Sequence, residues 1–162
     1  MRRHELREQV FKLLFRIEFN TPEDMPEQLN LYCNGFGAEE EGAPLKVVDM
    51  EKASDRFELI QGKISDIDAL INENTEGWDT NRMGKVELTV LRLAVFEMLY
   101  DEDVPTNVAI NEAVEIAKKY GQEGSGAFVN AILGKIFPKM NPISLYDFLV
   151  LLSKVQNLKY FS

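Results

Sequence analysis

The chain has 162 residues and a mass of 18.5 kDa, which is the size of one domain with a sizeable hydrophobic core. Its 27 acidic and 18 basic residues give a net charge of −9 and a pI near 4.7, which argues against nucleic-acid binding by charge spread over the whole surface. Hydrophobic residues make up 45% of the sequence, too many for a disordered chain.

The first half of the chain predicts three helical segments, because apolar residues recur at helical spacing. The first covers about residues 3–19. The second covers residues 21–33 and opens with threonine, proline and two acidic residues, a common helix start. Residues 34–44 contain three glycines and three successive glutamates, which is typical of a solvated loop. A long, charge-rich helix is predicted for residues 47–74.

The second half predicts four more helical segments. Residues 83–100 form the most apolar of them, and a helix apolar around most of its circumference belongs in the middle of a bundle. Residues 106–120 and 125–137 follow, and Pro138 is expected to end the latter. A short amphipathic segment is predicted for residues 143–155. The sequence therefore indicates a single all-α domain of six or seven helices.

The residues that most often build active or metal sites are scarce. Cys33 is the only cysteine and His4 the only histidine, so the chain has no internal disulfide and no Cys/His zinc site of the usual kind. No pair of carboxylates stands out as an acid–base couple. The charged start carries no signal peptide, and no apolar run is long enough to cross a bilayer. We expect a cytoplasmic protein with no catalytic residue, metal or cofactor.

The acidity is unevenly distributed. Residues 21–60 have a net charge of −7, whereas residues 1–20 carry five basic and three acidic side chains, a balance of +2. Arg3 and Arg7 lie one helical turn apart, with Arg2 just before them, and the arginine guanidinium group suits phosphate. The alternative to phosphate binding is that these arginines form ion pairs with neighbouring glutamates. Spacing alone slightly favours this alternative.

Two further features have a functional and a structural interpretation. Phe128 and Phe15 are core residues by default, but each could stack on an unpaired base if exposed beside basic residues. Residues 121–126 are rich in glycine and precede a helix, so their amides could contact a phosphate. The segment lacks the Lys-Ser/Thr ending of a P-loop. The simpler interpretation is that one helix ends and the next begins there.

Three segments together go beyond the patterning of a generic bundle. They are RRHELREQVFKLLFRIEF at residues 2–19, RMGKVELTVLRLAVFEMLY at residues 82–100 and VPTNVAINEAVEIAKKYGQEGSGAFVNAILGKI at residues 104–136. With these segments the chain resembles the NusB family of bacterial transcription antitermination factors. The resemblance implies two small helical bundles without enzymatic activity. It also implies binding of the single-stranded boxA element of nascent ribosomal RNA together with ribosomal protein NusE, for processive transcription of rRNA operons.

Matching the family motifs residue by residue gives the expected sites. Phe15 stands where the family usually has tyrosine. The partner surface is expected to include Phe15 and Glu87. The residues expected at the RNA surface are Arg2, Arg3, Arg7, Arg92, Lys118 and Phe128.

The resemblance also suggests a division of the chain and further partners. Residues 1–137 correspond to the RNA-binding domain, and residues 138–162 form a longer C-terminal extension that could cover a groove or mediate self-association. Assembly with an RNA polymerase antitermination complex and formation of a homodimer are further expectations. The alternative function is a helical protein-interaction scaffold that does not bind RNA.

Overall fold

The computed structural model describes residues 2–34, 47–77, 79–140 and Ser153, and the part it describes is helical with no strand. The elements in chain order are α1 (Arg3–Phe15), the 3-10 helix η1 (Arg16–Phe19), α2 (Met25–Cys33), α3 (Val47–Gln61), α4 (Ile64–Glu73), α5 (Lys85–Tyr100), α6 (Thr106–Tyr120) and α7 (Ser125–Met140). The expected all-α class is therefore confirmed.

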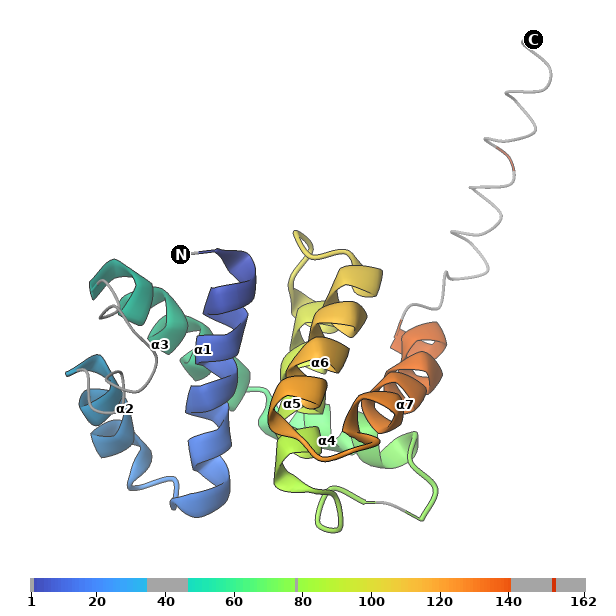
Figure 1. Cartoon of the computed structure of the whole chain (residues 1–162), viewed down its shortest axis with the longest axis horizontal. Helices are drawn as coiled ribbons and strands as arrows, with labels where there is room; N and C mark the ends of the chain where they lie inside the picture. The colour runs from blue at the N-terminus through green and yellow to red at the C-terminus, as the bar shows by residue number, and fades with distance from the viewer. Residues whose placement is uncertain (1, 35–46, 78, 141–152, 154–162) are drawn as a thin grey trace, which may run out of the picture.

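The helices form two small bundles, as expected (Figure 1). Helix α1 packs on α3, and α2 completes the first bundle, while α5, α6 and α7 pack on one another with α4 across them. Helix α5 also contacts α1 and so joins the bundles. Every residue from 88 to 97 is buried, which confirms that the most apolar helix is the central one.

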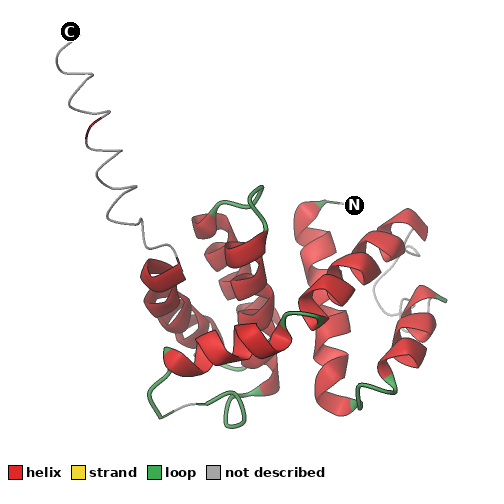
Figure 2. Cartoon of the chain, turned by 180° about the vertical axis from the view of Figure 1, so that it is seen from behind, coloured by secondary structure: helices red, strands yellow, loops and turns green. Residues whose placement is uncertain are grey.

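The segment predicted as one helix over residues 47–74 is two helices, because the chain turns at Gly62 and Lys63 (Figure 2). Lys63 has φ −115° and ψ 2°, outside the helical region, and its N–H donates to the carbonyl of Ile60 at 2.9 Å in a tighter turn. Glycine favours such a break because it costs conformational entropy in a helix. The break directs α3 to the first bundle and α4 to the second.

Two predicted helix ends were wrong. Helix α2 begins at Met25, because Thr21 forms a preceding turn in which its hydroxyl donates to Asp24 Oδ2 at 2.8 Å. Helix α7 continues through Pro138 to Met140. Proline removes its N–H bond to the carbonyl four residues earlier and its ring crowds that carbonyl, and in α7 both effects fall within the last turn.

Other sequence-based expectations lie outside the described residues. These are the structure of the acidic loop from residue 35 onward and of the C-terminal extension beyond residue 140, Ser153 excepted. The division of the chain at residue 137 stays a prediction.

Candidate nucleic-acid interface

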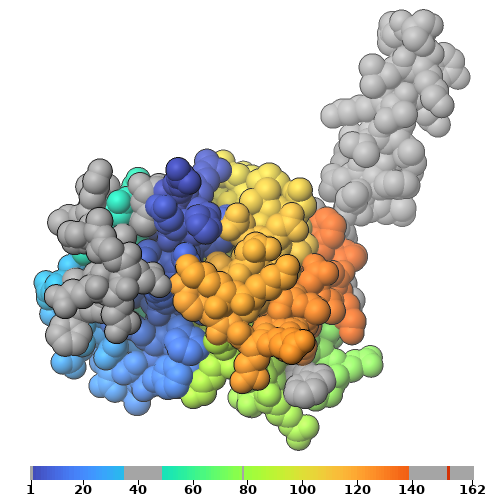
Figure 3. All heavy atoms as spheres, in the orientation of Figure 1, coloured from blue at the N-terminus to red at the C-terminus, as the bar shows by residue number. Residues whose placement is uncertain are grey.

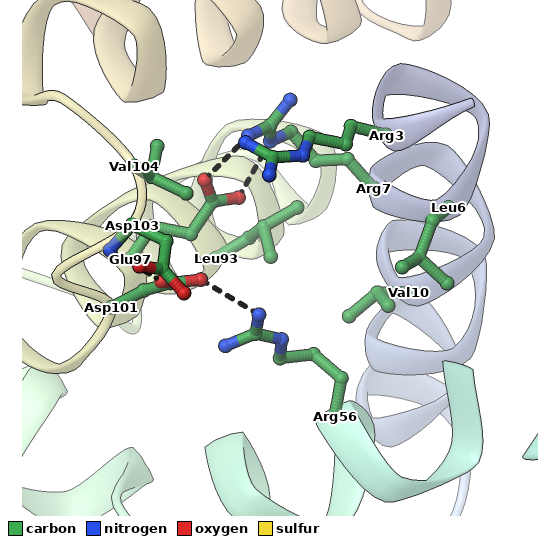
Figure 4. A pocket seen from close by; sticks show the side chains of 10 residues that line it. All are labelled: Arg3, Leu6, Arg7, Val10, Arg56, Leu93, Glu97, Asp101, Asp103 and Val104. Carbon is green, nitrogen blue, oxygen red and sulfur yellow. Dashed lines mark hydrogen bonds and ion pairs between the residues drawn. The ribbon is translucent and has the colours of Figure 1, made fainter. Parts of the chain in front are cut away.

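The two bundles are joined through one buried and one partly buried ion pair around a cavity of about 190 Å³ (Figure 4). Arg7 of α1 donates to both carboxylate oxygens of Glu97 on α5, at 2.7 and 2.8 Å. Arg56 of α3 donates to Asp101 at 2.7 Å, just beyond the end of α5. These contacts fix where the N-terminal end of α1, with its arginines, lies against the second bundle.

Arg7 has a buried side chain, only 9% of which is exposed. Burial alone would lower the pKa of its guanidinium, but the hydrogen bonds and charge of Glu97 outweigh burial and raise the pKa. The buried guanidinium is directed at a carboxylate of the neighbouring bundle. This geometry favours a role in positioning α1 over direct contact with RNA.

Arg92 is in a similar position on α5. Its guanidinium donates to both oxygens of Asp68 at 2.9 and 2.8 Å and to Glu18 at 2.6 Å, and it is 9% exposed. Burial would lower its pKa, but the bonds to Asp68 and Glu18 raise it. Arg92 thus connects α4 and η1 to the central helix, and the geometry again favours a positioning role.

Arg2 and Arg3 are exposed, in contrast to Arg7. The backbone N–H of Arg2 donates to Glu5 Oε2 at 3.1 Å, which satisfies one free amide at the start of α1. Arg3 makes no hydrogen bond or ion pair with the described residues and lies at the cavity between the bundles (Figure 4). Both side chains are therefore available to an anionic partner.

Helices α1 and α6 contact each other through Glu8, Phe11, Lys119 and Tyr120, which we call the α1–α6 seam. Residue spacing in the sequence did not reveal this contact. Lys119 and the Tyr120 hydroxyl both donate to Glu8 Oε1, each at 2.5 Å, and the Phe11 ring lies 5.1 Å from that of Tyr120. Burial would raise the pKa of Glu8, but these bonds, with the nearby charge of Lys12, lower it. The contacts join residues more than 100 positions apart, so only the fold brings them together.

Lys118, which precedes Lys119 on α6, is an exposed lysine whose stem packs toward α7. Its side chain is 63% exposed and its ammonium is 3.7 Å from Glu115, one turn earlier on α6. A surface pair of this kind contributes little to stability, so it leaves Lys118 accessible to a phosphate. The Lys118 stem also packs where a Cβ on Gly126 would lie, 2.9 Å from Lys118 Cγ, which is why α7 can approach α6 closely.

Glu87 and Phe128, expected on the partner and RNA surfaces respectively, line one cavity of about 340 Å³. The Ser125 hydroxyl donates to Glu87 Oε1 at 2.5 Å, which ties the start of α7 to the start of α5. Gly124, at φ +89°, makes the turn that brings the chain there. Phe128 is half-buried against the core. The cavity therefore combines a ring, a carboxylate and backbone of the glycine-rich turn.

Phe15 belongs to a row of aromatic rings along α1 and η1. It is half-buried, stacks on Phe11 with ring centroids 6.0 Å apart, and meets the edge of Phe19 at 5.0 Å. Lys85 lies over Phe19. Phe15 was expected at a functional surface from the sequence, whereas Phe19 and Lys85 were not, because their proximity depends on how α5 packs beside α1.

Across the part of the chain that the structure describes, no cluster of three or more His, Cys, Asp or Glu side chains could hold a metal ion. None of the helices described there is long and apolar enough to cross a membrane.

The two-bundle arrangement is shared by solved structures of NusB proteins. The structure superposes on NusB of T. maritima with a TM-score of 0.69 and 39% identity, covering 85% of this chain and 91% of that one. A NusB chain crystallised with NusE and dsRNA shares the fold at a TM-score of 0.65 and 24% identity, with coverage of 86% and 99%.

Sequence comparison assigns the family. The model of the NusB family matches residues 4–137. The transcription antitermination protein NusB of Lachnoclostridium phytofermentans is 45% identical over 136 residues, covering 84% of this chain and 98% of that relative. Its counterpart in Agathobacter rectalis is 47% identical over 135 residues, covering 83% and 98%. The chain belongs to the NusB family.

Proposed function

We propose that this antitermination factor binds the single-stranded boxA element of nascent rRNA together with ribosomal protein NusE and so promotes processive transcription of rRNA operons. The observation that carries the proposal is the exposed basic side chains beside α1, which stand out in a chain of net charge −9. Family membership supports the same conclusion. Binding phosphate releases counterions, so a few well-placed cations suffice for a local footprint.

The exposed cations suggest how the RNA is bound. Arg2 and Arg3 neutralise phosphates at the start of α1, and Lys118 does so on α6. Phe128 offers a ring beside the cavity at the start of α7, against which an unpaired base can stack. Arg7 and Arg92 act indirectly, since their ion pairs hold the helices that carry this surface.

NusE is proposed as the protein partner, with Glu87 and Phe15 at or near its surface. A basic partner would offset the acidity of this chain and extend the local cationic footprint. The fold is shared with a NusB that was crystallised with NusE and dsRNA. Assembly with RNA polymerase and homodimer formation stay predictions, as does the absence of enzymatic activity.

A mobility-shift experiment tests the proposal. Wild-type protein and the Arg2→Ala/Arg3→Ala variant are titrated into labelled boxA RNA with and without NusE. We expect retention of the RNA by the wild type, tighter retention with NusE, and weaker retention by the variant. No retention of boxA RNA under either condition would refute the proposal.

The second candidate function is a protein-interaction scaffold that does not bind RNA. The burial of Arg7 and Arg92 against carboxylates favours it, because two of the arginines expected at RNA serve packing instead. The scaffold predicts that RNA is retained only when NusE is present and that the Arg2→Ala/Arg3→Ala variant behaves like the wild type.

A further inference from the structure

Phe19, the last residue of η1, is an aromatic ring that the core does not cover. It is 60% exposed, although Phe11 and Phe15 in the same row are buried and half-buried. Its edge contact with Phe15, 5.0 Å between centroids at an angle of 65°, fixes the ring on one side. The ring is therefore held in place and largely open to solvent.

Lys85 places a cation against this ring. Its ammonium lies 4.2 Å from the Phe19 centroid, within the range of a cation–π contact. Lys85 is the first residue of α5 and makes no ion pair with the described residues. It follows Gly84 directly, and Gly84 lines the cavity that Glu87 and Phe128 share.

The ring lies beside residues proposed for both partners, because Phe15 and Glu87 belong to the proposed NusE surface and Phe128 to the proposed RNA surface. The start of α5, the lower end of α1 with η1, and the turn into α7 lie on one face of the molecule (Figure 3). Two carboxylates next to this part of the surface already have partners, since Glu18 accepts from Arg92 at 2.6 Å and Glu87 accepts from Ser125. Lys85 is the cation that lies against the Phe19 ring.

The surroundings of the ring favour a nucleic-acid base over an apolar protein segment. A partner helix would need a contiguous apolar area. The other large hydrophobic side chains that are exposed in the described part lie elsewhere: on α3, at the far end of α5, near the start of α6 and near the end of α7. A single ring beside a single cation instead matches a base and its adjacent phosphate.

We propose that Phe19 and Lys85 form an additional subsite for single-stranded RNA, in which an unpaired base stacks on the Phe19 ring and Lys85 neutralises a neighbouring phosphate. This subsite rests on the proposed RNA-binding function. Every base has a π-face, so the subsite adds affinity with little dependence on sequence.

The test compares variants in a fluorescence titration of labelled single-stranded boxA RNA, with each fold checked by its thermal unfolding midpoint. Phe19→Ala is expected to weaken binding about ten-fold, and Phe19→Leu should not restore it, because leucine supplies area without a π-face. Phe19→Trp should retain the affinity, and its fluorescence should be quenched by RNA beyond the background of Trp78. Lys85→Gln should weaken binding and reduce the salt slope by about one phosphate contact.

Phe137→Ala is the matched control, because it removes another exposed phenylalanine, at the end of α7, and should leave RNA affinity unchanged. Wild-type affinity in Phe19→Ala, with Arg3→Ala still weakened, would overturn the subsite and leave the proposed function intact. A Phe19→Ala variant that loses affinity only for NusE would also overturn it and make the ring a protein contact. Absence of RNA binding by the wild type would overturn both proposals.

Discussion

Arg7 carries a charge at the junction of the two bundles, where water has little access. Its two hydrogen bonds to Glu97 offset the cost of removing both charges from water, so each residue depends on the other. The sequence identified Arg7 as a basic residue on the first helix. It could not identify its partner, because Glu97 is 90 positions away and no local periodicity relates the two.

Replacing one member of this pair should destabilise the protein severely. We expect Arg7→Met to lower the free energy of unfolding by about 3–5 kcal/mol, since it leaves Glu97 buried and uncompensated. The double variant Arg7→Met/Glu97→Leu should recover most of that loss and bind RNA like the wild type. Urea denaturation measures the free energy of unfolding, and an RNA titration measures the affinity for RNA. An Arg7→Met protein of normal stability that has lost RNA affinity would instead make Arg7 a direct contact.

Glu8 links the stability of the α1–α6 seam to pH. Its pKa is lowered from 4.5 in the folded protein, because the bonds from Lys119 and Tyr120 outweigh burial. A lowered carboxylate pKa contributes stability above the unfolded value, and that contribution is lost as the pH falls through the folded value. We expect Glu8→Gln to be less stable than the wild type at pH 7, with the difference shrinking below about pH 4.5.

Chemical denaturation at several pH values between 3 and 7 measures this effect. Glu115→Gln is the control, because Glu115 is a highly exposed glutamate that forms a 3.7 Å ion pair with Lys118 on its own helix, and the effect of this substitution should be small throughout. A Glu8→Gln difference that does not vary with pH would mean that the charge of Glu8 is not what stabilises the seam.

Most of the helices could be predicted from local sequence signals. The prediction failed where packing between helices decides the structure. The helix over Thr106–Tyr120 agrees with its predicted bounds, because Pro105 and Gly121 flank an uninterrupted amphipathic stripe. The turn at Gly62 was missed because the apolar spacing continues across it from Ile60 to Ile67. Gly62 favours the break locally, and the packing of the two helices on different bundles requires it.

The turn from α6 to α7 depends on a close approach at Gly121. A Cβ there would lie 2.6 Å from the carbonyl oxygen of Ala117 and 2.5 Å from Ser125 Oγ, too close for either to remain in place. We expect Gly121→Ala to lower the free energy of unfolding by about 1–3 kcal/mol and to disturb the Ser125–Glu87 bond. Thermal unfolding and amide NMR shifts at the start of α7 measure the two effects.

Gly134 provides the control for this substitution. It lies within α7, and a Cβ there would have nothing within 4 Å. Gly134→Ala should be neutral or stabilising by up to about 1 kcal/mol, because alanine favours the helix. If Gly121→Ala and Gly134→Ala changed the stability equally, the close approach at Gly121 would not be what constrains the turn from α6 to α7.

At the scale of the whole molecule, charge and fold act together. A net charge of −9 discourages binding to arbitrary nucleic acid, and the proposed RNA surface uses the exposed cations beside α1. The sequence showed that the segment with a net positive charge is residues 1–20. It could not separate the exposed Arg2 and Arg3 from the buried Arg7, because burial depends on how α1 meets α5. Nor could it bring Glu87 and Phe128 to one cavity.

The most direct test of RNA binding by Arg2 and Arg3 is the salt dependence of boxA affinity in the presence of NusE. The observed association constant is measured over a range of salt concentrations for the wild type and for Arg2→Ala/Arg3→Ala. We predict weaker binding by the variant and a log–log slope that is shallower by about 1.4, the value for two lost single-strand phosphate contacts. Identical affinities and slopes for the two proteins would contradict the account.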